Sequence, residues 1–140
     1  MNRRAWLLPI LIVAVNALTL LILWHSLPEK LPAHFDLQGN AGGSMPRTTL
    51  LFYPLAGAVI CGIAYAAARL AEKRSANKAQ AQWVRAGLII LATGIGLVIL
   101  SSTMVTLTTG TMPVFMLAEP VILAIALTAF VICLVRARKQ

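Results

Sequence analysis

Residues 5–24 read AWLLPILIVAVNALTLLILW, a run of twenty residues without a charged side chain. A helix rises about 1.5 Å per residue, so a run of this length crosses the roughly 30 Å hydrocarbon core of a bilayer. The rest of the chain has the same character, since 59% of the 140 residues are hydrophobic, 11% are charged and the mean hydropathy is +0.84. A soluble domain of this size needs far more polar surface, so the composition excludes a soluble globular protein.

Three further stretches are long and apolar enough to span a membrane, at about residues 49–70, 83–106 and 113–135. The connections between them are short. The expected fold class is therefore an all-α integral membrane protein, with residues 1–140 forming a single membrane domain, a bundle of four antiparallel transmembrane helices. The alternative for the first span is a cleaved signal peptide. Its apolar run exceeds the roughly 7–15 residues of a signal sequence, and no small-x-small cleavage site follows it.

The basic residues lie mostly on one side of this four-span arrangement. The other side carries only Lys30 and Arg47 of the twelve, together with three of the four acids. Because Lys and Arg are retained on the cytoplasmic side during insertion, we expect both termini in the cytoplasm. These charges are expected to meet anionic lipid headgroups there, and they explain the net charge of +8 without a nucleic-acid partner. The ten residues of the cytoplasmic side are Arg3, Arg4, Arg69, Lys73, Arg74, Lys78, Arg85, Arg136, Arg138 and Lys139.

The one long outer connection includes residues 27–47, which read LPEKLPAHFDLQGNAGGSMPR. Its three prolines fix φ and remove backbone donors, which prevents a long helix, and its glycines permit turns. Leu31, Phe35 and Leu37 are apolar enough to pack back against the helices. We therefore expect an ordered, Pro/Gly-rich loop that caps the outer ends of the first two spans.

This loop carries the pattern Pro28-x-x-x-Pro32-x-His34-Phe35-Asp36-x-x-Gly39. Between two spans, the pattern resembles a bacterial domain-of-unknown-function family that forms the N-terminal part of SdpI-type immunity proteins, over about residues 10–66. The resemblance implies residence in the bacterial inner membrane. It also implies protection against a membrane-active toxin, or signalling through a regulator held at the membrane.

The chain departs from the family pattern at three positions. Gly42 stands where the family has an acid, Pro46 where it has Ser, and Arg47 where it has Lys. The basic charge is therefore kept and the second acid is lost. The residues expected to form the recognition loop are Pro28, Pro32, His34, Phe35, Asp36, Gly39 and Arg47.

His34 and Asp36 are two residues apart, so on an extended chain their side chains point to the same side. With Glu29 or Glu119 they offer an incomplete set of zinc ligands, since zinc takes three or four. The alternatives are a hydrogen-bonding role for His34 within the loop and a proton-sensing role, because imidazole titrates near neutral pH. The sequence favours the hydrogen-bonding role, and no metal or other cofactor is assigned.

Glu119 is the acid closest to membrane depth, where ionisable groups are costly and often functional. If the fourth helix begins at Pro120, Glu119 is an N-cap at the outer interface. If it begins near Pro113, Glu119 lies about 9 Å along the helix and is a candidate for ion or proton handling with Thr103 and Thr106. The cap costs less and is the arrangement that the sequence favours. The two threonines have a structural alternative as well, which is bonding back to carbonyl groups of their own helix.

Small residues four apart favour close packing of the second and third helices, and they also allow a homo-oligomer. The pairs are Gly57 with Cys61, Ala58 with Gly62, and Ala92 with Gly96.

The chain has no nucleophile–base pair, phosphate-binding loop, haem-ligand pattern or metalloprotease motif, so we do not expect an enzyme. The first hypothesis is a membrane protein whose outer loop recognises a toxic peptide or an envelope signal. The second is a small transporter or channel-like subunit that uses Glu119 and the hydroxyl groups of the third helix. The third is an accessory subunit of a larger membrane complex, with a protein partner in the bilayer.

Overall fold

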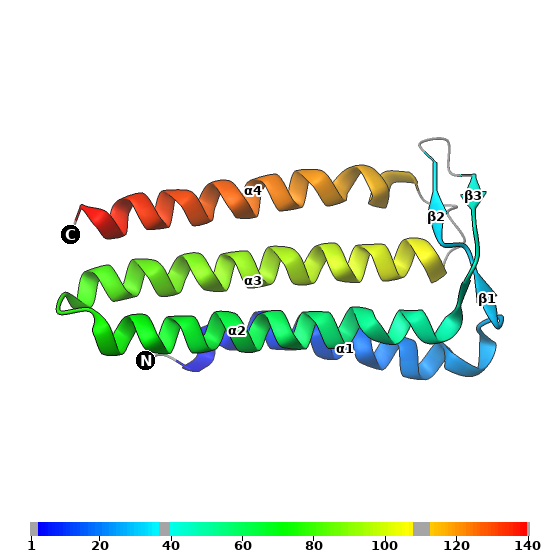
Figure 1. Ribbon diagram of the computed structural model, residues 1–140, viewed down its shortest axis with the longest axis horizontal. Coiled ribbons are helices and arrows are strands. Elements are labelled where there is room, and N and C mark those ends of the chain that lie inside the picture. The colour runs from blue at the N-terminus through cyan, green and yellow to red at the C-terminus, as the bar shows by residue number, and fades with distance from the viewer. Residues whose placement is uncertain (1–2, 37–39, 108–112, 140) are drawn as a thin grey trace.

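The computed structural model describes residues 3–36, 40–107 and 113–139, and side chains are described for these residues except Arg3, Phe35 and residues 113–117. Four long helices dominate (Figure 1): α1 (Leu7–Leu23), α2 (Phe52–Arg74), α3 (Lys78–Leu107) and α4 (Pro113–Arg138). Short 3-10 helices flank α1 and precede α2, namely η1 (Arg3–Trp6), η2 (Trp24–Ser26) and η3 (Arg47–Leu51). All four long helices are long and apolar enough to cross a membrane. The chain is therefore a multi-pass membrane protein with the expected number of spans.

The helices extend beyond the apolar runs that the sequence marks. α2 continues through Arg74, and α3 begins at Lys78 rather than near residue 83. The added residues are rich in Ala, Lys and Gln, which favour helix in water as well as in lipid. Asn77 caps the start of α3, where its Oδ1 accepts a hydrogen bond from the Ala79 backbone N–H at 2.8 Å. Hydropathy therefore identifies the apolar, membrane-spanning part of each helix and misses the polar residues that extend the helix at its ends.

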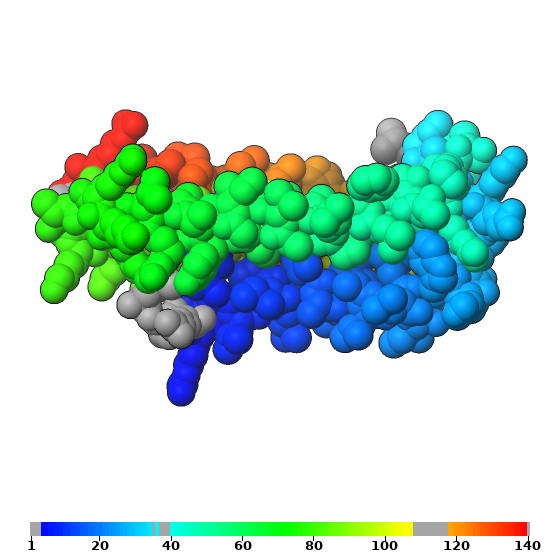
Figure 2. Space-filling view, turned by 60° about the horizontal axis from the view of Figure 1, so that its bottom comes forward, coloured from blue at the N-terminus to red at the C-terminus, as the bar shows by residue number. Residues whose placement is uncertain are grey.

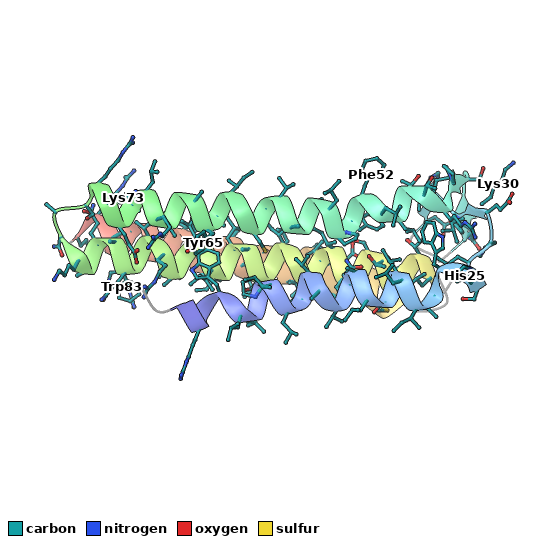
Figure 3. All side chains as sticks on the ribbon, turned by 90° about the horizontal axis from the view of Figure 1, so that it is seen from below. His25, Lys30, Phe52, Tyr65, Lys73 and Trp83 are labelled. Carbon is teal, nitrogen blue, oxygen red and sulfur yellow. The ribbon has the colours of Figure 1, made fainter. Side chains whose placement is uncertain are left out.

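Both chain termini lie at one end of the molecule, and the short strands between α1 and α2 lie at the opposite end (Figure 1). We call these the terminal end and the hairpin end. Lys73 and Trp83 belong to the terminal end, whereas His25 and Lys30 belong to the hairpin end (Figure 3). At the terminal end Arg85 forms an ion pair with Glu72 at 3.3 Å, and the Arg136 guanidinium lies 5.0 Å from the centre of the Trp83 ring.

The four helices do not form a closed bundle. α3 packs against each of the other three helices, and α1 also packs on α2, but within the described residues α4 packs mainly along α3 (Figure 1). The expectation of a bundle therefore holds for α1–α3, while α4 is an outlying helix. Many of its large apolar side chains are exposed, and those of Val121, Ile125 and Val131 are more than half exposed.

α3 and α4 meet along what we call the small-residue seam, made by Gly87 and Gly94 of α3 with Ala126 and Cys133 of α4. A Cβ added at Gly87 would lie 3.0 Å from the Cβ of Cys133, and one added at Gly94 would overlap the Cβ of Ala126. Within each helix the two positions are seven residues apart, a spacing that keeps one face of a helix toward its neighbour. The absence of side chains at the glycines lets the two backbones approach closely.

The small residues of α2 divide between two faces. Gly57 packs inward, since an added Cβ would lie 3.0 Å from Val13 and 3.9 Å from Ile99. Gly62 has open space around the position of a Cβ, and both Gly62 and Ala58 are exposed. The expectation that Ala58 and Gly62 pack against the third helix is therefore wrong. A four-residue spacing marks a stripe of small residues, but it does not show whether protein or lipid covers that stripe.

Candidate functional site

The connection between α1 and α2 forms a hairpin with one continuous register. β1 (Lys30–Leu31) pairs with β4 (Met45–Pro46), and β2 (His34–Phe35) pairs with β3 (Ala41–Gly42), all antiparallel. At the base of the hairpin the Arg47 N–H donates to the Glu29 carbonyl at 2.9 Å, and near the tip the Asp36 N–H donates to the Asn40 carbonyl at 3.0 Å. These pairs all follow one register, in which each step forward along the first side of the hairpin is matched by one step back along the other. No residue is therefore inserted or skipped between the Glu29–Arg47 pair and the Asp36–Asn40 pair.

The ladder is interrupted midway, between the two pairs of strands. Pro32 follows β1 and has no N–H to donate, which weakens pairing at this point. On the opposite side Gly43 has a φ of +64°, a conformation that side-chain-bearing residues rarely adopt. The break separates a lower part of the hairpin, which contacts the helices, from an upper part that carries His34 and Asp36.

Leu31 anchors the lower part to the helix ends. Its side chain is 2% exposed and packs in an apolar cluster with Leu20 of α1 and Leu50 of η3. Leu107, at the end of α3, packs against the same cluster. The expectation that Leu31 packs back against the helices is confirmed. The Phe35 side chain and the whole of Leu37 lie outside the described part of the structure.

Arg47 joins the hairpin to the end of α1. Its Nη1 donates to the backbone carbonyls of Leu27 at 3.3 Å and Trp24 at 3.5 Å, and its guanidinium lies 5.2 Å from the centre of the Trp24 ring. The carbonyls at a helix C-terminus carry partial negative charge, which a cation stabilises. These contacts explain why a basic residue is suited to this position, and they make Arg47 a positioning residue of the hairpin.

His34 is exposed on β2, directly opposite Gly42. A Cβ added at Gly42 would collide with the His34 imidazole, so the ring lies over the glycine. The same ring is within 3.5 Å of the position of a Cβ at Gly43. Gly42 is therefore the surface on which the imidazole rests. One face of the ring is covered by backbone, and the side chain remains open to the surroundings.

Asp36 uses its carboxylate within the hairpin. Oδ1 accepts a hydrogen bond from the Asn40 backbone N–H at 2.8 Å, and Oδ2 accepts one from the Asn40 side-chain amide at 2.8 Å. These bonds join Asp36 to Asn40 across the upper end of the described part of the hairpin. Asp36 therefore has a structural role that the sequence did not predict, and Asn40 is the partner that the sequence analysis missed.

The other predicted loop residues are spread along the hairpin. Pro28 is exposed and Pro32 is half-buried. Phe35 belongs to β2, while Gly39 lies outside the described residues. Within residues 3–36, 40–107 and 113–139, no three His, Cys, Asp or Glu side chains are close enough together to hold a metal ion.

Glu119 lies inside α4 and is not an N-cap. The helix begins at Pro113 and includes Pro120, so the favoured arrangement, in which a helix started at Pro120, is wrong. The carboxylate is half-buried, and its Oε1 accepts a hydrogen bond from the Ser102 hydroxyl of α3 at 2.9 Å. Glu119 is also seven residues before Ala126, so the spacing of the small-residue seam brings it toward α3.

Thr103 and Thr106 do not join this pair. The Thr103 hydroxyl donates to the Ile99 carbonyl at 2.9 Å, and the Thr106 hydroxyl donates to the Ser102 carbonyl at 2.9 Å. Both side chains are buried and bonded to their own helix, which is the structural alternative considered for them. The hydroxyl that meets Glu119 belongs to Ser102, which the sequence analysis did not single out. One available signal was the spacing of small residues in α3. Gly87, Gly94 and Ser101 are seven residues apart and mark the face of α3 that meets α4, and Ser102 is next to Ser101 in the chain.

Part of the chain, including the hairpin, is similar to a known family. Residues 10–58 match the family described as Domain of unknown function (DUF1648). The match covers a little over a third of the chain and includes most of α1, the hairpin and the first part of α2. No curated protein and no solved structure matches the chain. Glu119 and α4 lie outside the matched residues.

Proposed function

We propose that this is a recognition protein of the bacterial inner membrane, whose hairpin binds a toxic peptide or an envelope signal on the outer side. Two similarities support the proposal. Residues 10–58 match a family of unknown function, and the loop pattern resembles that of SdpI-type immunity proteins. The basic terminal end then faces the cytoplasm, as the distribution of Lys and Arg predicts.

The observation that carries the proposal is the contrast between the two parts of the hairpin. The lower part is fixed to the helices by Leu31 and Arg47. The upper part presents the exposed His34 imidazole on a glycine surface. A binding surface needs such a rigid support, because loop ordering on binding otherwise reduces affinity.

A protection assay tests this function. Cells that express the protein and cells that carry an empty vector are challenged with a panel of membrane-active peptides, and survival is measured. We expect protection against at least one peptide, and we expect the His34→Ala variant to lose it while still inserting at wild-type levels.

His25→Ala is the matched control. His25 is also an exposed histidine at the hairpin end, but it belongs to η2 and not to the hairpin (Figure 3). Its loss should leave protection unchanged. A protein that protects against no peptide, or a His34→Ala variant that protects as well as the wild type, would refute the proposed function.

A second candidate function, cation or proton transfer, is favoured by the Ser102–Glu119 hydrogen bond. Glu119 is six residues from the start of α4, about 9 Å along the helix. A carboxylate at this depth is costly unless it has a partner or a task. Flux of protons and of monovalent cations into proteoliposomes tests this candidate, with Glu119→Gln expected to abolish it. Glu72→Gln is the control, because Glu72 is paired with Arg85 at the terminal end.

A further inference from the structure

An apolar groove runs along the outward face of the α1–α2 pair, and Figure 2 looks onto the line where these two helices meet. The volume of the groove is about 500 Å³. Its walls are almost entirely apolar, and they include Ile10, Ala14 and Ala17 of α1 with Ala58, Gly62 and Tyr65 of α2. Four of these six residues are Ala or Gly. Because they have small side chains or none, the space between the two adjacent helices is left unfilled.

The groove has the length of one bilayer leaflet. Trp6 and Ala17 mark its two ends on α1, and eleven residues of helix span about 16 Å. Half of a hydrocarbon core of roughly 30 Å is about 15 Å. Beyond Ala17 a second apolar hollow of about 300 Å³ continues toward Trp24 at the hairpin end. The two hollows meet at Ala17, close to the middle of α1, as two chains from opposite leaflets would meet.

The terminal end of the groove is aromatic and is followed by positive charge. Trp6 and Tyr65 stack edge to face there, with ring centres 5.3 Å apart, a placement typical of the membrane interface. Arg69 follows Tyr65 by one helical turn, and its side chain is 50% exposed. Its Nη1 lies 4.0 Å from the Glu72 carboxylate, which pairs more closely with Arg85 at 3.3 Å. Arg3 and Arg4 precede Trp6 in the chain. A molecule in the groove therefore meets cations at the point where the apolar walls end.

We propose that this groove binds one acyl chain of an anionic phospholipid from the leaflet at the terminal end, with its phosphate beside Arg69. Lipid tails are as apolar as the helix surface, so burial in the groove brings no hydrophobic gain by itself. Selection among lipids then depends on the fit of the chain and on the charge of the headgroup. One Lys or Arg near the membrane surface contributes about 1 kcal/mol of attraction to an anionic lipid, which is about a fivefold preference over a neutral lipid.

The test measures which lipids stay bound. The full-length protein is reconstituted in nanodiscs of equal amounts of phosphatidylglycerol and phosphatidylcholine with identical chains, then released into mild detergent and weighed by native mass spectrometry. We expect one retained lipid per protein, with phosphatidylglycerol favoured about fivefold. The Arg69→Gln variant should still retain a lipid but with little preference between the two.

Gly62→Phe fills the groove from its floor and should abolish retention. Gly62 has open space around it, so the helices need not move to accept the ring. Ala58→Leu is a second variant of the same kind. Ala67→Phe is the matched control, because Ala67 is exposed on α2 but does not line the groove, and this variant should retain the lipid.

Three results would overturn the inference. The first is equal retention of both lipids by the wild-type protein. The second is retention by Gly62→Phe and Ala58→Leu at the level of Ala67→Phe. The third is a wild-type dimer that Gly62→Phe converts to a monomer, which would assign the groove to a second copy of the chain. None of these results depends on whether the hairpin binds a peptide.

Discussion

Gly94 of α3 and Ala126 of α4 are in contact so close that the Cβ of any other residue at position 94 would overlap the alanine. This contact belongs to the small-residue seam, which also brings Gly87 against Cys133. Within the described residues α4 packs mainly along α3, so the seam is the centre of its main interface, with the Ser102–Glu119 hydrogen bond and the Arg136–Trp83 contact at other points along the same helix pair. The seam thereby determines which residues of α3 meet Glu119.

Gly94→Val should separate α3 from α4. Overpacking of a close contact costs about 1–3 kcal/mol, and here the strain falls on the main interface of α4. We expect a lower thermal unfolding temperature in detergent and loss of the Ser102–Glu119 hydrogen bond. Gly62→Val is the control, because its added side chain enters open space. Equal effects of the two substitutions would contradict the assignment of the seam.

Replacement of Arg47 should loosen the hairpin without unfolding the helices. Arg47→Leu removes the donors to the Trp24 and Leu27 carbonyls and the contact with the Trp24 ring. The expected loss is about 1–2 kcal/mol of local stability, measured as faster amide hydrogen exchange in the hairpin. Arg47→Lys should be intermediate, because an ammonium group lacks the planar fork. Unchanged exchange in Arg47→Leu would mean that Leu31 alone holds the hairpin.

Gly42→Ala should displace the His34 side chain. The new methyl group occupies the space of the imidazole, so the ring must rotate away from the strand. The chemical shifts of the His34 ring protons should change, while those of His25 stay the same. If the hairpin is the recognition site, this variant should also reduce protection in the cell assay. An unchanged His34 spectrum would show that the ring does not rest on Gly42 in the membrane.

The orientation of the chain can be tested by labelling single cysteines. Cys61 and Cys133 are free, and replacing both by Ala gives a background for new cysteines at Ser44 and Lys139. A membrane-impermeant maleimide added to intact spheroplasts should label Ser44→Cys and not Lys139→Cys, because Lys and Arg are retained in the cytoplasm. The opposite pattern would place the hairpin on the cytoplasmic side.

Much of the loop could be anticipated from its composition. The prolines and glycines predicted turns in place of a helix, and Leu31 was expected to pack against the spans. The roles of Arg47 and Asp36 were not visible, because each depends on a partner that spacing does not identify. Arg47 meets carbonyls of Trp24 and Leu27, about twenty residues earlier in the chain, and Asp36 meets an asparagine whose importance depends on the hairpin register.

The sequence by itself determined the four spans and the placement of most cations beside one set of span ends. Both properties are local, since each span depends only on its own twenty or so residues and the flanking charges. Only the tertiary structure decided that α4 packs mainly on α3, that Glu119 lies inside a helix and meets Ser102, and that Gly62 faces outward. The reason is that membrane helices are apolar on every side. The hydrophobic pattern then no longer distinguishes the side of a helix that faces protein from the side that faces lipid. The close fit of Gly94 against Ala126 determines which side of α3 faces α4.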